Sequence, residues 1–417
     1  MAEIGSIGNV TATADVSKDD TKQNRIKELR TRAIGSEVMG KITTSKTIYF
    51  WLLLYFGLGG FYLLCAFISQ HSEGAIPQGG RPPIRLLDDF YYPPQEDLYY
   101  PYCKVSKGFD FDPKGFSYAY DYNMLAALAY ETPNVTGYLL DRWFAGENVI
   151  VDETPFVTKW REDTDNVGNP VSFKLFSVPS LPGTGIVSIR GTQTTEDRLI
   201  NGQLYMSSIF TQLVRYAQPF SWLWSTIWDD LIATVSWVST DRLNRAAHYR
   251  ITTRFVNDLV KNNYTFEGKS FHTLRTTGVS LGGGIALITG AQTGAFAFAI
   301  AGVNPTLGRL TFDPPIPLEA LNSRVLNVVP DRDFISHIGD PPRLTQKLVC
   351  RSPVSDIGSC HSFWRIFCEF LYTCGSKPRP VLCTCAEKFG YPEPIQNGTR
   401  TFAEACSEEE AIVRQFG

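Results

Sequence analysis

The chain has 417 residues, enough for one large domain or two smaller ones. Hydrophobic residues make up 43% of it and charged residues 19%, which is ordinary for a globular protein with a sizeable core. The formal net charge of −3 leaves no basic surplus to neutralise phosphates, so the composition argues against a nucleic-acid-binding protein.

An apolar run from Ile48 to Ile68 carries no charged residue. As a helix it would span roughly 31 Å, the thickness of the hydrocarbon core of a bilayer. We interpret the run as a transmembrane signal anchor. A buried core helix and a cleaved signal peptide are the alternatives. The run is apolar on every side, and the polar tail before it is long for a signal peptide.

Lys and Arg residues are more frequent before the apolar run than after it. The positive-inside rule therefore predicts a single-pass type II membrane protein, with its N-terminus in the cytosol and its main domain in an endomembrane lumen or outside the cell. We expect four segments along the chain. They are a disordered cytosolic tail (1–45), the anchor (46–68), a Pro- and Tyr-rich stalk or strap (69–102) and a globular domain (103–417) whose C-terminal part is rich in cysteine.

One of the nine cysteines lies in the apolar run, and all the others follow it. An even number of cysteines in an oxidising compartment predicts four disulfides, for which 105 connectivities are possible. Reduced thiols and a zinc site are the alternatives, but the paired C-x-x-C spacing of zinc sites is absent, so we expect no metal. The cysteines beyond the run are Cys103, Cys350, Cys360, Cys368, Cys374, Cys383, Cys385 and Cys406.

Three sequons for N-glycosylation, at Asn134, Asn263 and Asn397, lie on the predicted lumenal side. A fourth, at Asn9, would be cytosolic and unused. Such triplets also occur by chance, so they only support the orientation.

Strand patterns alternate with helix patterns through the globular region, which predicts an α/β fold with a mainly parallel central sheet. The strand patterns are β-branched and alternating, whereas the helix patterns repeat every three to four residues. The expected strands are 173–178, 185–190, 274–279 and 324–329, and the expected helices begin at Tyr122 and cover 246–262 and 281–293.

The segment from Gly278 to Gly282 has the pattern G-x-S-x-G around Ser280, between a predicted strand and a predicted helix. In such an elbow the serine hydroxyl is pushed out of the sheet, and the glycines lack side chains that would collide. The backbone N–H of Leu281, at the start of the helix, could then stabilise an oxyanion. We interpret Ser280 as a nucleophile; the alternative is a glycine-rich turn with an idle serine.

Four segments in this order resemble the class 3 (fungal-type) lipase family of the α/β-hydrolase superfamily. The resemblance covers roughly residues 118–374, most of the globular region. One departure is Val279, where most members carry histidine. The segments are Ala127–Tyr130 (ALAY), Ser188–Thr192 (SIRGT), Thr277–Gly284 (TGVSLGGG) and Val325–Phe334 (VLNVVPDRDF).

The resemblance implies a Ser–Asp–His triad, in which histidine takes the proton of the serine and the acid orients the histidine. The chain order of α/β-hydrolases leaves His337 and His361 as candidate bases. We favour His361, because it lies in a cysteine-rich loop that a disulfide could hold. For the acid, the family pattern favours Asp333 over Asp331. The resemblance also implies Thr192 as a second oxyanion donor beside the N–H of Leu281.

Residues 204–240 hold four of the eight tryptophans and directly follow the predicted oxyanion segment. In the resembling lipases a lid helix occupies this place and opens at a lipid interface. An aromatic lid and ordinary core helices are equally open interpretations.

The sequence thus predicts a membrane-anchored serine esterase, similar to triacylglycerol lipases, that hydrolyses acyl esters of glycerolipids at a membrane interface. No metal or organic cofactor is expected. A phospholipase or a diacylglycerol lipase is the nearest alternative. A non-catalytic lipid-binding or adhesion glycoprotein on the same fold is the alternative from another class.

Overall fold

The computed structural model describes only part of the chain, and the chain divides by its contacts into two units, Met1–Ile68 and Ser69–Gly417. Every described residue belongs to the second unit. The predicted tail and anchor, Thr192 and the tryptophan-rich segment 204–240 lie outside the described residues. None of the helices in the described part has the length and hydrophobicity that a membrane span requires. The described residues are 83–95, 100–103, 118–154, 157, 160, 173–178, 183–191, 249–266, 269–353, 357–396 and 398–415.

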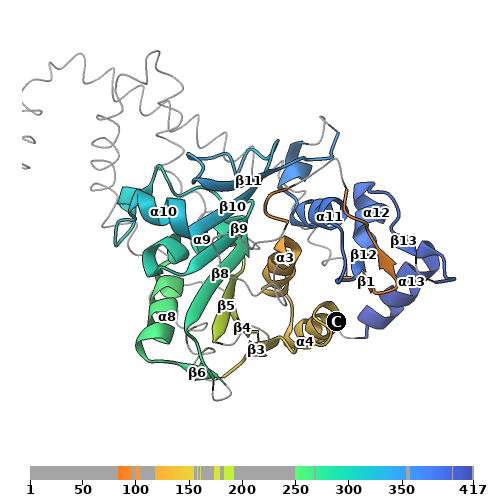
Figure 1. Cartoon of the computed structure of the whole chain (residues 1–417), viewed down its shortest axis with the longest axis horizontal. Helices are drawn as coiled ribbons and strands as arrows, with labels where there is room; N and C mark the ends of the chain where they lie inside the picture. Colours follow the sequence, from red (N-terminus) through yellow and green to blue (C-terminus); the bar gives the residue numbers. More distant parts are fainter. Residues whose placement is uncertain are drawn as a thin grey trace, which may run out of the picture. The chain divides into compact units, whose positions relative to one another are not determined.

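A seven-stranded sheet lies at the centre of this unit, in the order β11-β10-β9-β8-β5-β4-β3 (Figure 1). Strands β5, β8, β9, β10 and β11 run parallel, while β4 and β3 extend the sheet at one edge through antiparallel pairs. The prediction of an α/β fold with a mainly parallel sheet is confirmed. The strands are β3 (Ile150–Asp152), β4 (Phe173–Ser177), β5 (Thr184–Ile189), β8 (Thr273–Val279), β9 (Phe296–Ile300), β10 (Val325–Pro330) and β11 (Leu344–Leu348).

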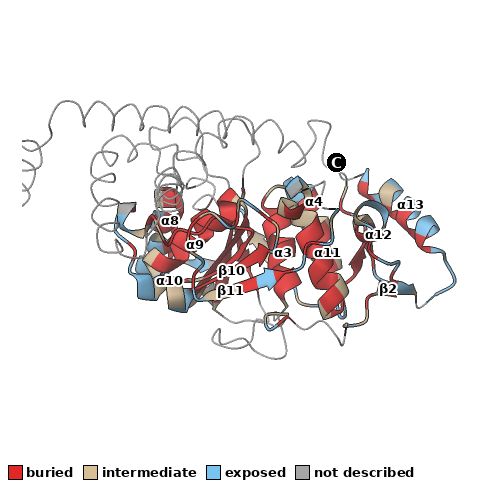
Figure 2. Cartoon of the chain, turned by 90° about the horizontal axis from the view of Figure 1, so that it is seen from above, coloured by how far each residue is buried: buried red, intermediate tan, exposed pale blue. Residues whose placement is uncertain are grey.

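Helices cover both faces of the sheet (Figure 1). Alternation along β9 explains this arrangement, since Phe298 and Ile300 join the hydrophobic cluster that contains α3, whereas Ala297 and Ala299 join the cluster that contains α8 and α9. The inner strands of the sheet, α3, α9 and α11 are the most deeply buried elements (Figure 2). One face carries α8 (Tyr249–Lys261), α9 (Leu281–Thr293) and α10 (Leu318–Arg324), and the other carries α3 (Ala119–Leu128) and α11 (Phe363–Cys374).

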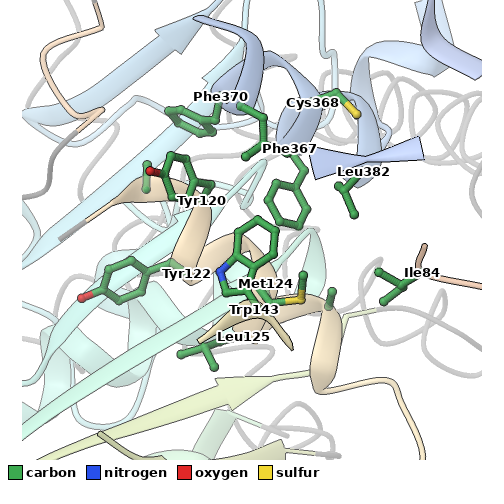
Figure 3. Packing of buried hydrophobic residues seen from close by; sticks show 14 of the residues in the cluster. Ile84, Tyr120, Tyr122, Met124, Leu125, Trp143, Phe367, Cys368, Phe370 and Leu382 are labelled. Atoms are coloured by element: carbon green, nitrogen blue, oxygen red, sulfur yellow. The ribbon is translucent and has the colours of Figure 1, made fainter. Parts of the chain in front are cut away.

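An aromatic core joins α3 to α11 (Figure 3). The ring of Trp143, at the end of α4 (Pro133–Trp143), lies 5.2 Å from that of Phe367 and 6.0 Å from that of Tyr120, centroid to centroid. Both contacts are edge-to-face, the geometry that aromatic quadrupoles favour. These large buried rings fix the helical layer against which the C-terminal part of the domain packs.

The segment 83–95 is part of the folded domain. Its strand β1 (Leu86–Leu87) pairs with β12 (Val381–Leu382), and β2 (Phe90–Tyr91) pairs with β13 (Ile395–Gln396). Leu86 and Phe90 are buried in the core. The domain therefore extends N-terminally of Cys103 into the segment that we interpreted as a stalk or strap. The remaining described elements are β6 (Thr265–Phe266), β7 (Lys269–Ser270), α12 (Cys383–Phe389), α13 (Phe402–Val413) and the 3-10 turns η2 (Arg309–Thr311) and η3 (Ile357–His361).

All the cysteines beyond the apolar run are paired at disulfide distance, which confirms the expected disulfides. Three of the pairs lie in the C-terminal part, while the fourth joins the segment before α3 to the end of α11. The pairs are Cys103–Cys374, Cys350–Cys360, Cys368–Cys385 and Cys383–Cys406.

Candidate active site

Ser280 lies on the sharp turn between β8 and α9. Its φ of 55° and ψ of −120° lie in a region that residues with side chains rarely adopt, at a cost on the order of 1–3 kcal/mol. Backbone hydrogen bonds hold the turn, since the N–H of Ser280 donates to Ile300 O at 2.9 Å and that of Gly284 donates to Ser280 O at 2.9 Å. The strain is therefore kept in place by β9 and by the first turn of α9.

The two glycines of the motif are required by close backbone contacts. A Cβ at Gly278 would lie 2.5 Å from the carbonyl carbon and oxygen of Gly282. A Cβ at Gly282 would overlap the carbonyl oxygen of Ile189 at the end of β5. The structure thus confirms the prediction that side chains at Gly278 and Gly282 would collide with the backbone of the turn.

The imidazole of His361 lies between the serine and the acid. Its Nε2 is 2.8 Å from Oγ of Ser280, and its Nδ1 is 2.8 Å from Oδ2 of Asp333. The three side chains come from the turn after β8, the turn after β10 and the end of η3. Residues far apart in the sequence thus form one chain of hydrogen bonds.

Burial and charge set the protonation of this group. The side chain of Asp333 is 1% exposed and that of His361 is 14% exposed. Burial opposes ionisation of both groups, but each favours the charge of the other. The net result is a pKa of Asp333 below its ordinary value and a pKa of His361 above its ordinary value. Asp333 is therefore ionised and holds the Nδ1–H tautomer, which leaves Nε2 free to take a proton.

In the turn after β10, the two candidate carboxylates, Asp331 and Asp333, and the second candidate histidine, His337, have different hydrogen-bond partners. The backbone N–H of Ile335 donates to Oδ1 of Asp333 at 3.0 Å. The other carboxylate, Asp331, accepts the N–H of Cys350 at 2.9 Å. The other histidine, His337, has its Nδ1 2.6 Å from the carbonyl oxygen of Asp333, so it supports the main chain of the acid. The contact between Asp333 and Ile335 N–H is an Asx-type turn, which the sequence-based prediction did not include. Asp is one of the residue types that form such turns, because its side chain can accept from the N–H two residues further on.

The predicted oxyanion donors, Leu281 and Thr192, are described only in part. Leu281 is the first residue of α9, where backbone N–H groups have no partner within the helix. Thr192 lies outside the described residues, but Gly191 before it donates its N–H to the hydroxyl of Tyr130 at 2.7 Å. Tyr130 ends the ALAY segment, and the sequence-based prediction assigned it no contact with Gly191.

Asn134 and Asn263 are exposed, whereas Asn397 lies outside the described residues. No cluster of three or more His, Cys, Asp or Glu side chains that could hold a metal ion occurs within the described ranges.

Comparisons with protein-family models and with curated proteins find no match to this chain.

Proposed function

We propose that the chain is a serine hydrolase of α/β-hydrolase type that cleaves carboxylic esters. The observation that carries this proposal is the position of the His361 ring, 2.8 Å from the Ser280 hydroxyl on one side and 2.8 Å from the Asp333 carboxylate on the other. A strained serine beside an oriented imidazole is the arrangement that nucleophilic catalysis needs.

In the proposed reaction, Oγ of Ser280 attacks the ester carbonyl while Nε2 of His361 takes its proton. The negative charge of Asp333 stabilises the imidazolium that results. The tetrahedral oxyanion accepts hydrogen bonds from Leu281 N–H and from Thr192, and each such donor typically lowers the barrier by about 2.7–4 kcal/mol. Collapse expels the alcohol, which receives the proton from His361. Water then hydrolyses the acyl-enzyme by the same steps.

The proposed substrate is an acyl ester of a glycerolipid at a membrane surface. Its support is the resemblance of the motifs to class 3 lipases and the apolar run Ile48–Ile68, which as an anchor would keep the site beside an insoluble substrate. We also propose that the domain lies in an endomembrane lumen or outside the cell; the four disulfides support this, because disulfides persist in oxidising compartments.

A fluorophosphonate probe tests the chemistry, because it forms a covalent bond only with an activated serine. The full-length protein should be labelled, and Ser280→Ala should not be. Labelling that persists in Ser280→Ala would place the nucleophile elsewhere, and an unlabelled native protein would favour a binding role. Comparison of lipid hydrolysis products between native and Ser280→Ala protein then identifies the ester class.

A further inference from the structure

The loop that carries His361 is closed by a disulfide. Cys360, directly before His361, is bonded to Cys350, which lies two residues after the end of β11. The two Cα atoms are 5.6 Å apart, and the residues are 1% and 4% exposed. The position of the residue next to the imidazole is therefore tied to the position of Cys350.

The two residues before the acid hold the Cys350 end of this loop. The Nη2 of Arg332 donates to the carbonyl oxygen of Cys350, and to that of Ser352 at 2.7 Å. On the other side, Oδ1 of Asp331 accepts the N–H of Cys350 at 2.9 Å. Both side chains belong to the same turn as Asp333. The segment that carries the acid therefore also contacts the disulfide-bonded loop that carries His361.

A second arginine bridges the two ends of the loop. The side chain of Arg365, on α11, donates from Nε to Ser359 Oγ at 2.7 Å and from Nη1 to Arg351 O at 2.6 Å. Arg351 itself donates to the buried carboxylate of Glu369 at 2.9 Å. Both ends of the loop are thus fixed to α11, and the Cys350 end is additionally fixed to the turn after β10.

We propose that Arg332 is a positioning residue for His361. It holds the main chain at Cys350, and the disulfide passes this constraint to Cys360, so that the imidazole stays between Asp333 and Ser280. The inference rests on the proposed serine hydrolase function and deepens it. Its physical reason is that a misplacement of about 1 Å at a reacting group can cost about 10²-fold in rate. A guanidinium suits this role, because its donors lie in a rigid plane and can reach two carbonyls together.

The test uses full-length Arg332→Met and Arg332→Lys proteins with two measurements. The first is the rate of fluorophosphonate labelling. The second is the pKa of the His361 ring, followed by NMR with ring-labelled histidine; the chain has only five histidines, and His361→Gln identifies the signal. The Met variant should label about 10- to 10²-fold more slowly. Its His361 pKa should fall, since the Asp333 contact that raises it is loosened. The Lys variant should be intermediate.

A matched arginine control separates positioning from general stability. Arg400→Met removes an arginine that pairs with Asp89 at 2.7 Å and Glu408 at 2.6 Å, without contact to the loop in either pair. It should keep the labelling rate and the His361 pKa of the native protein.

For the disulfide, the Cys350→Ser/Cys360→Ser protein is compared with the Cys383→Ser/Cys406→Ser protein. Both lose a bridge of the C-terminal part, with sequence separations of 10 and 23 residues. At a temperature where both proteins are folded, only Cys350→Ser/Cys360→Ser should lower the labelling rate and shift the pKa of His361.

The inference is overturned if Arg332→Met and the loss of Cys350–Cys360 both leave the rate and the His361 pKa at native values. If Arg332→Met does not fold, the Lys variant and the disulfide pair decide in the same way. A native protein that is never labelled, but whose His361 pKa still moves in Arg332→Met, would reject the hydrolase proposal and keep the positioning role. If the native protein is labelled and the variants change neither the labelling rate nor the His361 pKa, the positioning role is rejected and the hydrolase proposal is kept.

Discussion

The guanidinium of Arg379 donates to the carboxylate of Asp121 in the interior of the domain, with Nε 2.8 Å from Oδ1 and side chains 4% and 0% exposed. The indole of Trp143 donates to the same carboxylate oxygen at 2.9 Å. Nη1 of Arg379 also forms an ion pair with Oε1 of Glu147 at 2.6 Å. The C-terminal part of the chain is thus joined to α3 by a buried ion pair and to the segment after α4 by a partly exposed one.

Replacing Arg379 by Met should destabilise the protein by about 3–5 kcal/mol, because it leaves the charge of Asp121 buried without its main partner. Denaturant unfolding measures this change. The double variant Asp121→Asn/Arg379→Met should recover part of the loss, since it buries no unpaired charge there. A double variant as unstable as the sum of the two single changes would show that the pair is not coupled.

Substituting Gly282 by Ala should disrupt the elbow. The added Cβ would overlap the carbonyl oxygen of Ile189, so β5 or α9 must shift. This shift should lower the stability of the fold by about 1–3 kcal/mol. The displaced Ser280 should also lose probe labelling. Gly137→Ala is the matched control, because Gly137 lies within α4 and a Cβ added there would meet nothing within 4 Å. It should stabilise the protein by about 0.5–1 kcal/mol and keep labelling; equal effects of the two changes would contradict the steric argument.

Labelling of Ser280 should rise with pH through the pKa of His361, because only the neutral ring can take the serine proton. Burial by itself lowers this pKa, but the charge of Asp333 and its hydrogen bond outweigh burial, so the midpoint should lie above 6.5, the ordinary value for histidine. In Asp333→Asn the rate should fall about 10⁴-fold, as for loss of the acid in a serine protease triad. The remaining activity should have its midpoint at lower pH. A native midpoint below 6.5 would be inconsistent with the Asp333 contact.

Peptide mapping without reduction should recover four cross-linked pairs, with Cys103 joined to Cys374 and Cys383 joined to Cys406. Removing Cys103–Cys374, whose partners are 271 residues apart, should cost about 2–5 kcal/mol. A disulfide between Cys383 and Cys385 would contradict the structure.

A lumenal domain should carry N-glycans at its exposed sequons. Asn134 follows Pro133 at the start of α4, and Asn263 follows the end of α8, and both are exposed. Enzymatic deglycosylation should reduce the mass of the native protein, and less so in Asn134→Gln/Asn263→Gln. A mass that does not change in the native protein would speak against the proposed orientation.

Much of the sheet could be predicted from local patterns. The expected strand 274–279 and helix 281–293 coincide with β8 and α9 to within one residue, and 324–329 coincides equally well with β10. The expected helix over 246–262 is described from Tyr249, as α8. These elements were accessible because side-chain alternation and helical spacing are properties of neighbouring residues.

The short strands β1 and β2 could not be predicted in the same way. Each has only two residues, too few for a periodic pattern, and each pairs with a partner near the other end of the chain. The segment that we interpreted as a stalk or strap therefore gave no local signal that Leu86 would be buried against the C-terminal part.

By itself the sequence determined the elbow around Ser280, the alternation of strands and helices, and a short list of candidate partners. The sequence favoured Asp333 over Asp331 and His361 over His337, but only the tertiary structure shows His361 in contact with both Ser280 and Asp333. Only the tertiary structure shows one disulfide pattern among about 105. The physical reason is range: local patterns depend on residues within one or two turns, whereas hydrogen bonds and disulfides between distant segments depend on how the whole sheet and its loops close in space.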